Sequence, residues 1–273
     1  MTYFYLQNSD ITMTKHLLAA LLALAFLSSG CVRYYYKPNA VNTPLFTGKN
    51  QVHASVAGSA GNTQSINRGR LSLLDVQAAW SPVNHLGLIA NYSHLSFRAE
   101  TPDFILGNEN AKVHLIEAGA GYYYALGDHK VKMVAEVYAG GGAGSIASDV
   151  NMKISRVFVQ GGIGLRSPWV DLAFTPRFSR VRYSHFDDRG HDIYYLAQQE
   201  LATEDGDRID KHSYYFFEPC FTLRGGYKFV KLQLQCALAD KTSDVNWNYS
   251  AAWFTFGLYL SMEDMLKIGR QQR

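Results

Sequence analysis

From residue 51 to residue 262, apolar and polar residues alternate with a period of two. In the segment LLDVQAAW, Leu74 and Val76 share one face of a strand, and Asp75 and Gln77 share the other. This period is typical of β-strands, whose successive side chains point to opposite faces. No helical period interrupts the pattern, so the sequence predicts an all-β protein. About ten runs of this kind occur, near residues 50–60, 70–80, 86–97, 112–126, 131–142, 152–166, 169–184, 213–227, 230–239 and 249–262.

The connections between these runs alternate in length. Tight turns such as SPVNH, GDHK and SP are followed by long polar stretches such as AETPDFILGNENA and the segment 186–212. Short turns at one end and long loops at the other are typical of transmembrane β-barrels, which have an even number of antiparallel strands. The predicted fold is therefore a closed antiparallel up-and-down transmembrane barrel of about ten strands. Both chain ends are then expected on the side of the short turns.

The polar face of the strands differs from that of a soluble sandwich, because arginine dominates it and the two signs of charge nearly balance. The opposite face is almost free of charge, as lipid contact requires. An unpaired buried charge costs several kcal/mol, so a narrow lumen needs paired charges. The charged residues on the polar face are Asp75, Glu117, Lys132, Glu136, Arg156, Arg166, Asp171, Arg177, Glu218, Arg224 and Lys231.

Hairpin register predicts two ion pairs in the lumen. A tight turn at Pro168 and Trp169 places Arg166 opposite Asp171, and an odd-length loop near Ile146 places Glu136 opposite Arg156. Directly opposite residues on one face of an antiparallel pair interact. These pairs are expected to close the lumen, so the barrel is not predicted to be a general porin.

Two further pairs of residues constrain the later strands. Pro176 and Pro219 fall at similar heights on adjoining strands, and proline donates no ladder hydrogen bond, so a shared bulge is expected there. Cys220 lies on the polar face and Cys236 on the apolar face. A disulfide needs a Cβ separation near 4 Å, so none is predicted between them.

Aromatic residues gather at both ends of the predicted strands. This distribution around a charge-free band resembles that of small Gram-negative outer-membrane β-barrels of the OmpA/OmpX type. The resemblance implies residence in outer-membrane lipid and assembly by the insertion machinery. The aromatic residues near the short turns are Trp80, Tyr122, Tyr123, Tyr124, Trp169 and Tyr227; those toward the long loops are Tyr92, Tyr138, Tyr183, Tyr214, Trp247, Tyr249 and Trp253.

The segment HLLAALLALAFLSSGC is the one long apolar run in the chain. It is too short for a spanning helix, and a basic residue, Lys15, precedes it while small residues follow it, as in a secretory signal peptide. The end of this run, LSSGC, resembles the lipobox of bacterial lipoproteins, with Leu27 one place further from the cysteine than usual. This resemblance implies cleavage before Cys31 and acylation of that residue. A plain secretory signal with a free Cys31 and a buried helix are the alternatives.

These features divide the chain into five parts. Residues 1–12 are interpreted as an over-extended start and residues 13–30 as the signal peptide. Residues 31–49 form a linker after the lipidated cysteine, which the sequence does not assign to the periplasm, the lumen or the wall. The barrel covers residues 50–262, and residues 263–273 form a C-terminal tail.

Composition and motifs narrow the possible functions. The net charge of +3 is too small to argue for nucleic acid, and the mean hydropathy of −0.14 excludes a helical membrane protein. The glycine-rich segment 139–145 lacks the Lys-Ser/Thr of a phosphate-binding loop. No catalytic residue, metal site or cofactor is predicted.

The long loop before the eighth run is the densest polar cluster. His185, Asp187, Asp188, His191 and Asp192 could bind a metal or activate water, as Asp–His pairs do in ten-stranded outer-membrane proteases. A solvated surface loop is the favoured interpretation.

Three functions compete on this sequence. The favoured one is a non-catalytic outer-membrane barrel lipoprotein of structural, adhesion or docking type, whose long loops meet an extracellular protein or glycan. The second is an outer-membrane hydrolase with its site in the 186–212 loop. The third is a soluble periplasmic lipocalin-like lipoprotein with its apolar face turned inward.

Overall fold

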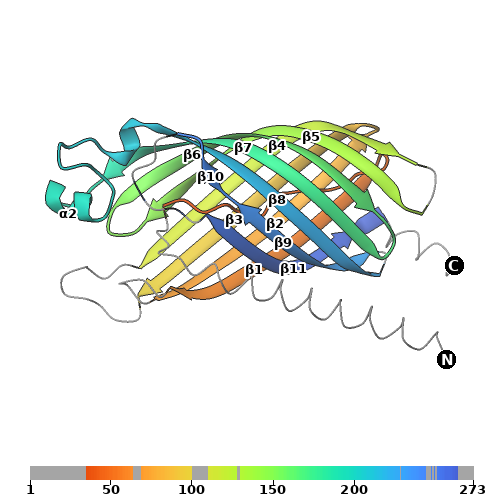
Figure 1. The fold of residues 1–273 in the computed structure, drawn as a ribbon, viewed down its shortest axis with the longest axis horizontal. Coiled ribbons are helices and arrows are strands. Elements are labelled where there is room, and N and C mark those ends of the chain that lie inside the picture. The colour runs from red at the N-terminus through yellow and green to blue at the C-terminus, as the bar shows by residue number, and fades with distance from the viewer. Residues whose placement is uncertain are drawn as a thin grey trace, which may run out of the picture.

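The computed structural model describes residues 35–63, 69–99, 110–127, 130–227, 229–243, 247, 249 and 251–263. They form a β-barrel with two short helices in one loop (Figure 1). The elements are β1 (Gln51–Thr63), β2 (Gly69–Val83), β3 (Leu86–Ala99), β4 (Ala111–Leu126), β5 (Lys132–Ala147), β6 (Asn151–Arg166), β7 (Val170–Asp187), α2 (Ile193–Gln198), η1 (Ile209–Lys211), β8 (Ser213–Tyr227), β9 (Val230–Leu238), β10 (Asp240–Lys241) and β11 (Ala252–Ser261).

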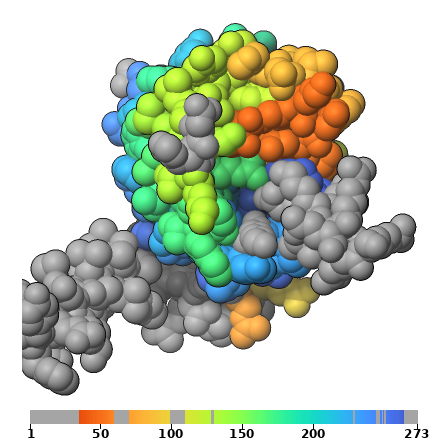
Figure 2. Space-filling model, turned by 90° about the vertical axis from the view of Figure 1, so that its right-hand side faces the viewer, coloured from red at the N-terminus to blue at the C-terminus, as the bar shows by residue number. Residues whose placement is uncertain are grey.

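The barrel is closed because β1 pairs with both β2 and β11. Every neighbouring pair is antiparallel, and sequential strands pair around the ring. β10 continues β9, since Ala237 faces Cys220 and Asp240 faces Phe217 in one unbroken register along β8. The wall therefore has ten strands, as predicted. Figure 2 looks onto the short-turn end, where the chain colours follow one another around the ring.

Pro176 and Pro219 face each other across β7 and β8 without a register shift, so the expected shared bulge is wrong. An antiparallel strand directs each residue's N–H to one neighbour only. The β6–β7 bridges skip Gly161, which stands opposite Pro176, and Gly162, which stands opposite Thr175, and resume in the same register. Proline has no N–H to donate, so bridges are missing beside Pro176 in the β6–β7 pair and beside Pro219 in the β8–β9 pair. The second gap is the point where β9 ends and β10 begins.

The long loops lie at one end of the barrel and the tight turns at the other, as predicted (Figure 1). The β5–β6 connection is an exception, because only residues 148–150 separate the two strands. The strands extend further than expected there, so the hairpin centre lies beyond Ile146. Glu136 therefore faces Gly162, and Arg156 faces Gly142. The predicted register between Glu136 and Arg156 is wrong by six residues, but an even shift keeps both side chains on the lumen face.

The wall turns its apolar face outward. Val157, Val159 and Ile163 are more than half exposed, whereas the inward Arg156 is 2% exposed. The nine residues from Val157 to Leu165 match the length that a tilted strand needs to cross a bilayer. This orientation contradicts the lipocalin-like alternative, which requires the apolar face inside. Among the described residues, no helix is long and apolar enough to span a membrane.

Above this apolar band, toward the long loops, the pattern inverts. On β2, Arg70 and Ser72 point outward, and Leu71 and Leu73 are buried inside. The same reversal occurs on other strands, and we call this part of the barrel the collar. Its outward polar residues include Arg70, Ser72, Lys112, Lys153, Ser155, Arg180 and Arg182, and its inward apolar residues include Leu71, Leu73, Met152, Ile154, Val181, Tyr183, Tyr214 and Phe216. Polar outside and apolar inside is the arrangement of a protein in water, so the collar lies beyond the bilayer.

The collar alters the interpretation of the aromatic residues. Near the short turns, Trp80, Tyr122, Tyr124, Trp169 and Tyr227 are exposed on the outer wall as expected, whereas Tyr123 is buried. Toward the long loops, the second predicted girdle is wrong for its buried members. Tyr183, Tyr214 and Trp247 fill the interior of the collar, because the inversion reverses the face that apolar residues occupy there. Tyr138 is instead buried in the lumen nearer the short turns, in a cluster with Phe46 and Tyr123.

We predict that lysine is costly in the band and tolerated in the collar on the same face of β2. Val76→Lys places a charge in lipid and should lower the free energy of unfolding by about 2 kcal/mol. Ser72→Lys, two residues before Leu74 on the same outward face but in the collar, should change the free energy of unfolding by less than about 0.5 kcal/mol. Urea unfolding in lipid vesicles measures both, and equal effects would contradict the proposed boundary.

A candidate functional site in the barrel lumen

Residues 35–50, which we call the lumen segment, run through the interior of the barrel. Tyr35 lies within the collar, and Phe46 lies near the short turns against Tyr123 and His53. Residues 38–46 are all buried. The part of the predicted linker that the structure describes therefore fills the lumen. It also places Tyr35 at the long-loop end. The chain ends, which were expected at the short turns, lie outside the described residues.

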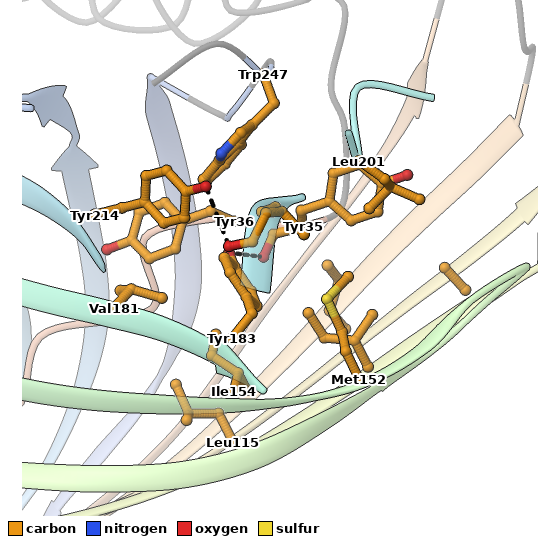
Figure 3. Close-up of a cluster of buried hydrophobic side chains, with 14 of the residues drawn as sticks. Tyr35, Tyr36, Leu115, Met152, Ile154, Val181, Tyr183, Leu201, Tyr214 and Trp247 are labelled. Atoms are coloured by element: carbon orange, nitrogen blue, oxygen red, sulfur yellow. Dashed lines mark hydrogen bonds between the residues drawn. The ribbon is translucent and has the colours of Figure 1, made fainter. Parts of the chain in front are cut away.

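The N-terminal part of the lumen segment is held in the apolar interior of the collar (Figure 3). The carbonyl of Tyr35 accepts a hydrogen bond of 2.8 Å from the hydroxyl of Tyr183. The ring of Tyr36 stacks on Phe216 with the centroids 3.9 Å apart. Leu196 of α2, together with Leu201 and Ile209, covers this cluster from the long loop before β8.

Below the collar, Glu218 is the centre of a buried charge cluster. It accepts hydrogen bonds from Arg156, from Arg177 Nε at 2.8 Å, and from the hydroxyls of Ser179 and Tyr36. Both arginines and Glu218 are at most 2% exposed. Two guanidinium groups share this carboxylate, and Glu117 supplies a second negative charge 3.4 Å from Arg156.

Asn39 inserts its side chain between these charges. Its Oδ1 accepts from Arg156 at 2.8 Å and from Arg177 at 2.9 Å, and its Nδ2 donates to Glu117 at 2.7 Å. An uncharged amide with both donor and acceptor atoms can bridge positive and negative groups at once. The lumen segment is therefore part of the charge cluster and adds three hydrogen bonds to it.

Along the middle of the lumen, side chains of the wall bind the backbone of the segment. Each residue from 39 to 45 has at least one backbone group bonded in this way. Three carboxamides, those of Gln77, Gln235 and Gln160, donate to the carbonyls of residues 40, 41 and 42 at 2.7–2.8 Å. The remaining contacts are Arg177 to Asn39 O, Ala40 N to Asp75, Arg224 to Thr43 O, Tyr259 to Pro44 O, Leu45 N to Glu136, and Arg166 to Leu45 O.

At the short-turn end, Glu263 closes the lumen. Its carboxylate lies 2.7 Å from Arg166 and 2.9 Å from His53, and the two strands that carry these partners lie on opposite sides of the short-turn mouth. Burial alone raises the pKa of the Glu263 carboxyl. The hydrogen bonds and charges of His53 and Arg166 outweigh burial and hold that pKa well below its usual range.

The four residues expected to form lumen ion pairs all lie on the inner face, but their partners differ from those expected. Arg166 does face Asp171 in the register. The Asp171 carboxylate, however, receives Lys231 Nζ at 2.6 Å, and Arg166 bonds Glu263. Arg156 binds Glu218 and Glu117, while Glu136 accepts the backbone N–H of Leu45. Directly opposite positions did not decide the pairing, because long side chains reach across the lumen to other strands and to the lumen segment.

The polar residues of the long loop do not converge. Asp187 and Asp188 accept backbone N–H groups two residues ahead in local turns, and Asp192 caps α2. His185 bonds the neighbouring Ser184, and His191 stacks on Tyr195. In the described part of the chain, no group of three His, Cys, Asp or Glu is placed to hold a metal ion.

One pair in this loop was not singled out by the sequence. Asp207 lies 2.6 Å from His212, with both side chains about half exposed. They border a cleft that Arg208 and Trp247 also line. The pair closes a turn, since Asp207 N also bonds Thr203.

The remaining cysteines lie where the alternation predicts. Cys220 is buried on the lumen face beside Val41, and Cys236 is on the outer face; both are free thiols. Cys31 lies outside the described residues, as do the predicted signal peptide and most of the C-terminal tail.

We predict that Glu218→Gln lowers the free energy of unfolding by about 3 kcal/mol, because it leaves two buried guanidinium groups short of negative charge. Asp210→Asn removes the carboxylate of a partly exposed pair with Arg208 and should cost less than about 1 kcal/mol. Urea unfolding in vesicles compares them. Equally small effects would mean that the lumen charges are hydrated and not buried.

Comparisons with known proteins find similarity only at the level of solved structures. No family model matches the chain, and no curated protein matches it. The crystal structure of Neisserial surface protein A is 16% identical, covers 50% of this chain and 87% of its own, and has a TM-score of 0.29. The translocator domain of the autotransporter NalP from Neisseria meningitidis is 11% identical, covers 93% and 95%, and has a TM-score of 0.42. Neither similarity carries an argument about the role of this barrel.

Proposed function

We propose that this chain is an outer-membrane β-barrel lipoprotein of a Gram-negative bacterium. In this proposal its role is structural, adhesive or partner-docking, and its long loops meet an extracellular protein or glycan. The apolar band supports residence in a bilayer, and the outward polar residues of the collar support exposure of the long-loop end to water. Outer-membrane barrels direct their long loops outward, so the collar would stand on the cell surface.

The observation that carries the proposal is the filled lumen. Solute passage needs a continuous water path, and here nine consecutive buried residues of the same chain occupy the interior. The backbone of residues 39–45 is bonded to side chains from the wall, so the segment is fixed along most of its length. A barrel closed in this way offers its loops and collar for function, and not its interior.

Catalysis is not part of the proposal. The side chains expected to form a hydrolase site are engaged in turns, a helix cap and ring stacking, each with its own local partner. The Asp207–His212 pair could orient a proton, but hydrolysis also needs a nucleophile or a bound water held against a substrate.

We predict that the wild-type protein gives no steady conductance in a planar bilayer. Removal of residues 35–47 should open a small, steady, water-filled pore, because only side chains of the wall then remain inside. Removal of loop residues 101–108 is the matched control and should leave the bilayer silent. Heat-modifiable electrophoretic mobility verifies that each variant is folded.

Two outcomes would overturn the proposed closure. Large, steady, unselective conductance from the wild-type protein would make it a porin. A folded variant that lacks residues 35–47 and stays as silent as the wild type would mean that the wall, and not the lumen segment, closes the barrel.

Acylation of Cys31 is the second part of the proposal. Labelling of growing cells with a clickable fatty-acid analogue should mark the protein, and Cys31→Ser should abolish the label. Cys236→Ser is the matched control, because its thiol lies on the outer wall and should not affect acylation. Label that survives the Cys31→Ser change would contradict lipoprotein status.

A further inference from the structure

The lumen segment has a defined direction through the barrel. β1 begins at Gln51, at the short-turn end, and the segment before it crosses the whole barrel to reach Tyr35 in the collar. The carbonyl of Leu45 is bonded near the short turns by Arg166, and that of Tyr35 is bonded in the collar by Tyr183. The described part of the segment therefore begins at the long-loop end of the lumen and runs toward the short turns.

In the middle of the lumen, the wall contacts the backbone of the segment, and such contacts suit any polypeptide. Gln77, Gln160 and Gln235 bind backbone carbonyls, which every residue has. Arg224 and Arg166 also bind carbonyls, those of residues 43 and 45. Such contacts do not depend on the side chain of the bound residue, so they hold an extended chain in the lumen whatever its side chains.

A second set of contacts does depend on sequence and fixes the final position. Asn39 fits among Arg156, Arg177 and Glu117, and the amide of Asn42 donates to Asn91 at 2.9 Å. Tyr36 donates to Glu218. These side-chain contacts favour one register and would hold the threaded chain there.

We propose that this barrel holds the chain before Tyr35 on the extracellular side of the outer membrane, threaded outward through its own lumen. The inference rests on the proposed function for the assignment of the long-loop end to the cell exterior. Cys31 is four residues from Tyr35, so an extended chain keeps it within about 14 Å of that residue. Acyl chains on Cys31 would then lie on the extracellular side, and not in the periplasmic leaflet.

Cysteine labelling on intact cells tests this topology. Arg33→Cys should react with a membrane-impermeant maleimide as completely as Asn108→Cys in the β3–β4 loop. Asp128→Cys in the β4–β5 turn should react only after the outer membrane is permeabilised. The protein with its three natural cysteines gives the background, because Cys31 is blocked by acylation in the proposed function, Cys220 is buried and Cys236 faces the band.

A matched variant tests the role of threading. When residues 35–47 are removed, residue 33 is joined to the short-turn end, and Arg33→Cys should lose its labelling on intact cells. Labelling of Asn108→Cys should persist in the same background and would verify that the barrel is inserted.

The outcomes separate the two proposals. If Asn108→Cys labels and Arg33→Cys labels only after permeabilisation, the threading inference is wrong and the proposed function stands. If Asn108→Cys itself fails to label on intact cells while Asp128→Cys succeeds, the orientation in the proposed function is wrong. Unchanged labelling of Arg33→Cys after removal of residues 35–47 would also overturn the inference, because the lumen would not be its route.

Discussion

The Glu218 cluster is the interaction on which the arrangement of this barrel depends. Because the outer face of the apolar band carries no charge, the charged side chains of the strands lie in the interior. Buried charges are tolerated when they are paired and hydrogen-bonded. Wall residues alone bring Arg156 and Arg177 to Glu218, but Asn39 bridges both arginines to Glu117. The lumen segment thus stabilises the wall as much as the wall holds the segment, and closure of the lumen follows from the same contacts.

The collar links this interior to the water beyond the apolar band. Where the strands leave the band, the outer face becomes polar and the inner face apolar, so the barrel ends in a small water-exposed domain with its own core. Tyr35 and Tyr36 are buried in that core, and Leu196, Leu201 and Ile209 of the long loop cover it. The long loop therefore covers this end of the lumen segment, and its polar residues serve the turns and the helix cap that shape the loop.

Much of the wall could be predicted from the alternation of residues. The ten strands, their antiparallel order, the apolar outer face and the opposite faces of Cys220 and Cys236 follow from a period of two. The inversion on β2 was also present in the sequence. By alternation, Leu71 and Leu73 lie on the same face as Asp75, and Arg70 lies on the same face as Leu74. The pattern of a strand was thus visible along its whole length, and the change in its polarity marked the edge of the bilayer.

The sequence by itself determined which residues face inward, because the period of a strand fixes the face of every side chain once one is known. Only the tertiary structure decided which inward charges meet. The register between β5 and β6 shifted by six residues, which preserved the face of Glu136 but changed its neighbour, and long side chains such as that of Arg156 reached across the lumen. The path of residues 35–50 also depends on the tertiary structure. This segment has no helical or strand period in its sequence, and wall side chains fix its position by binding its backbone.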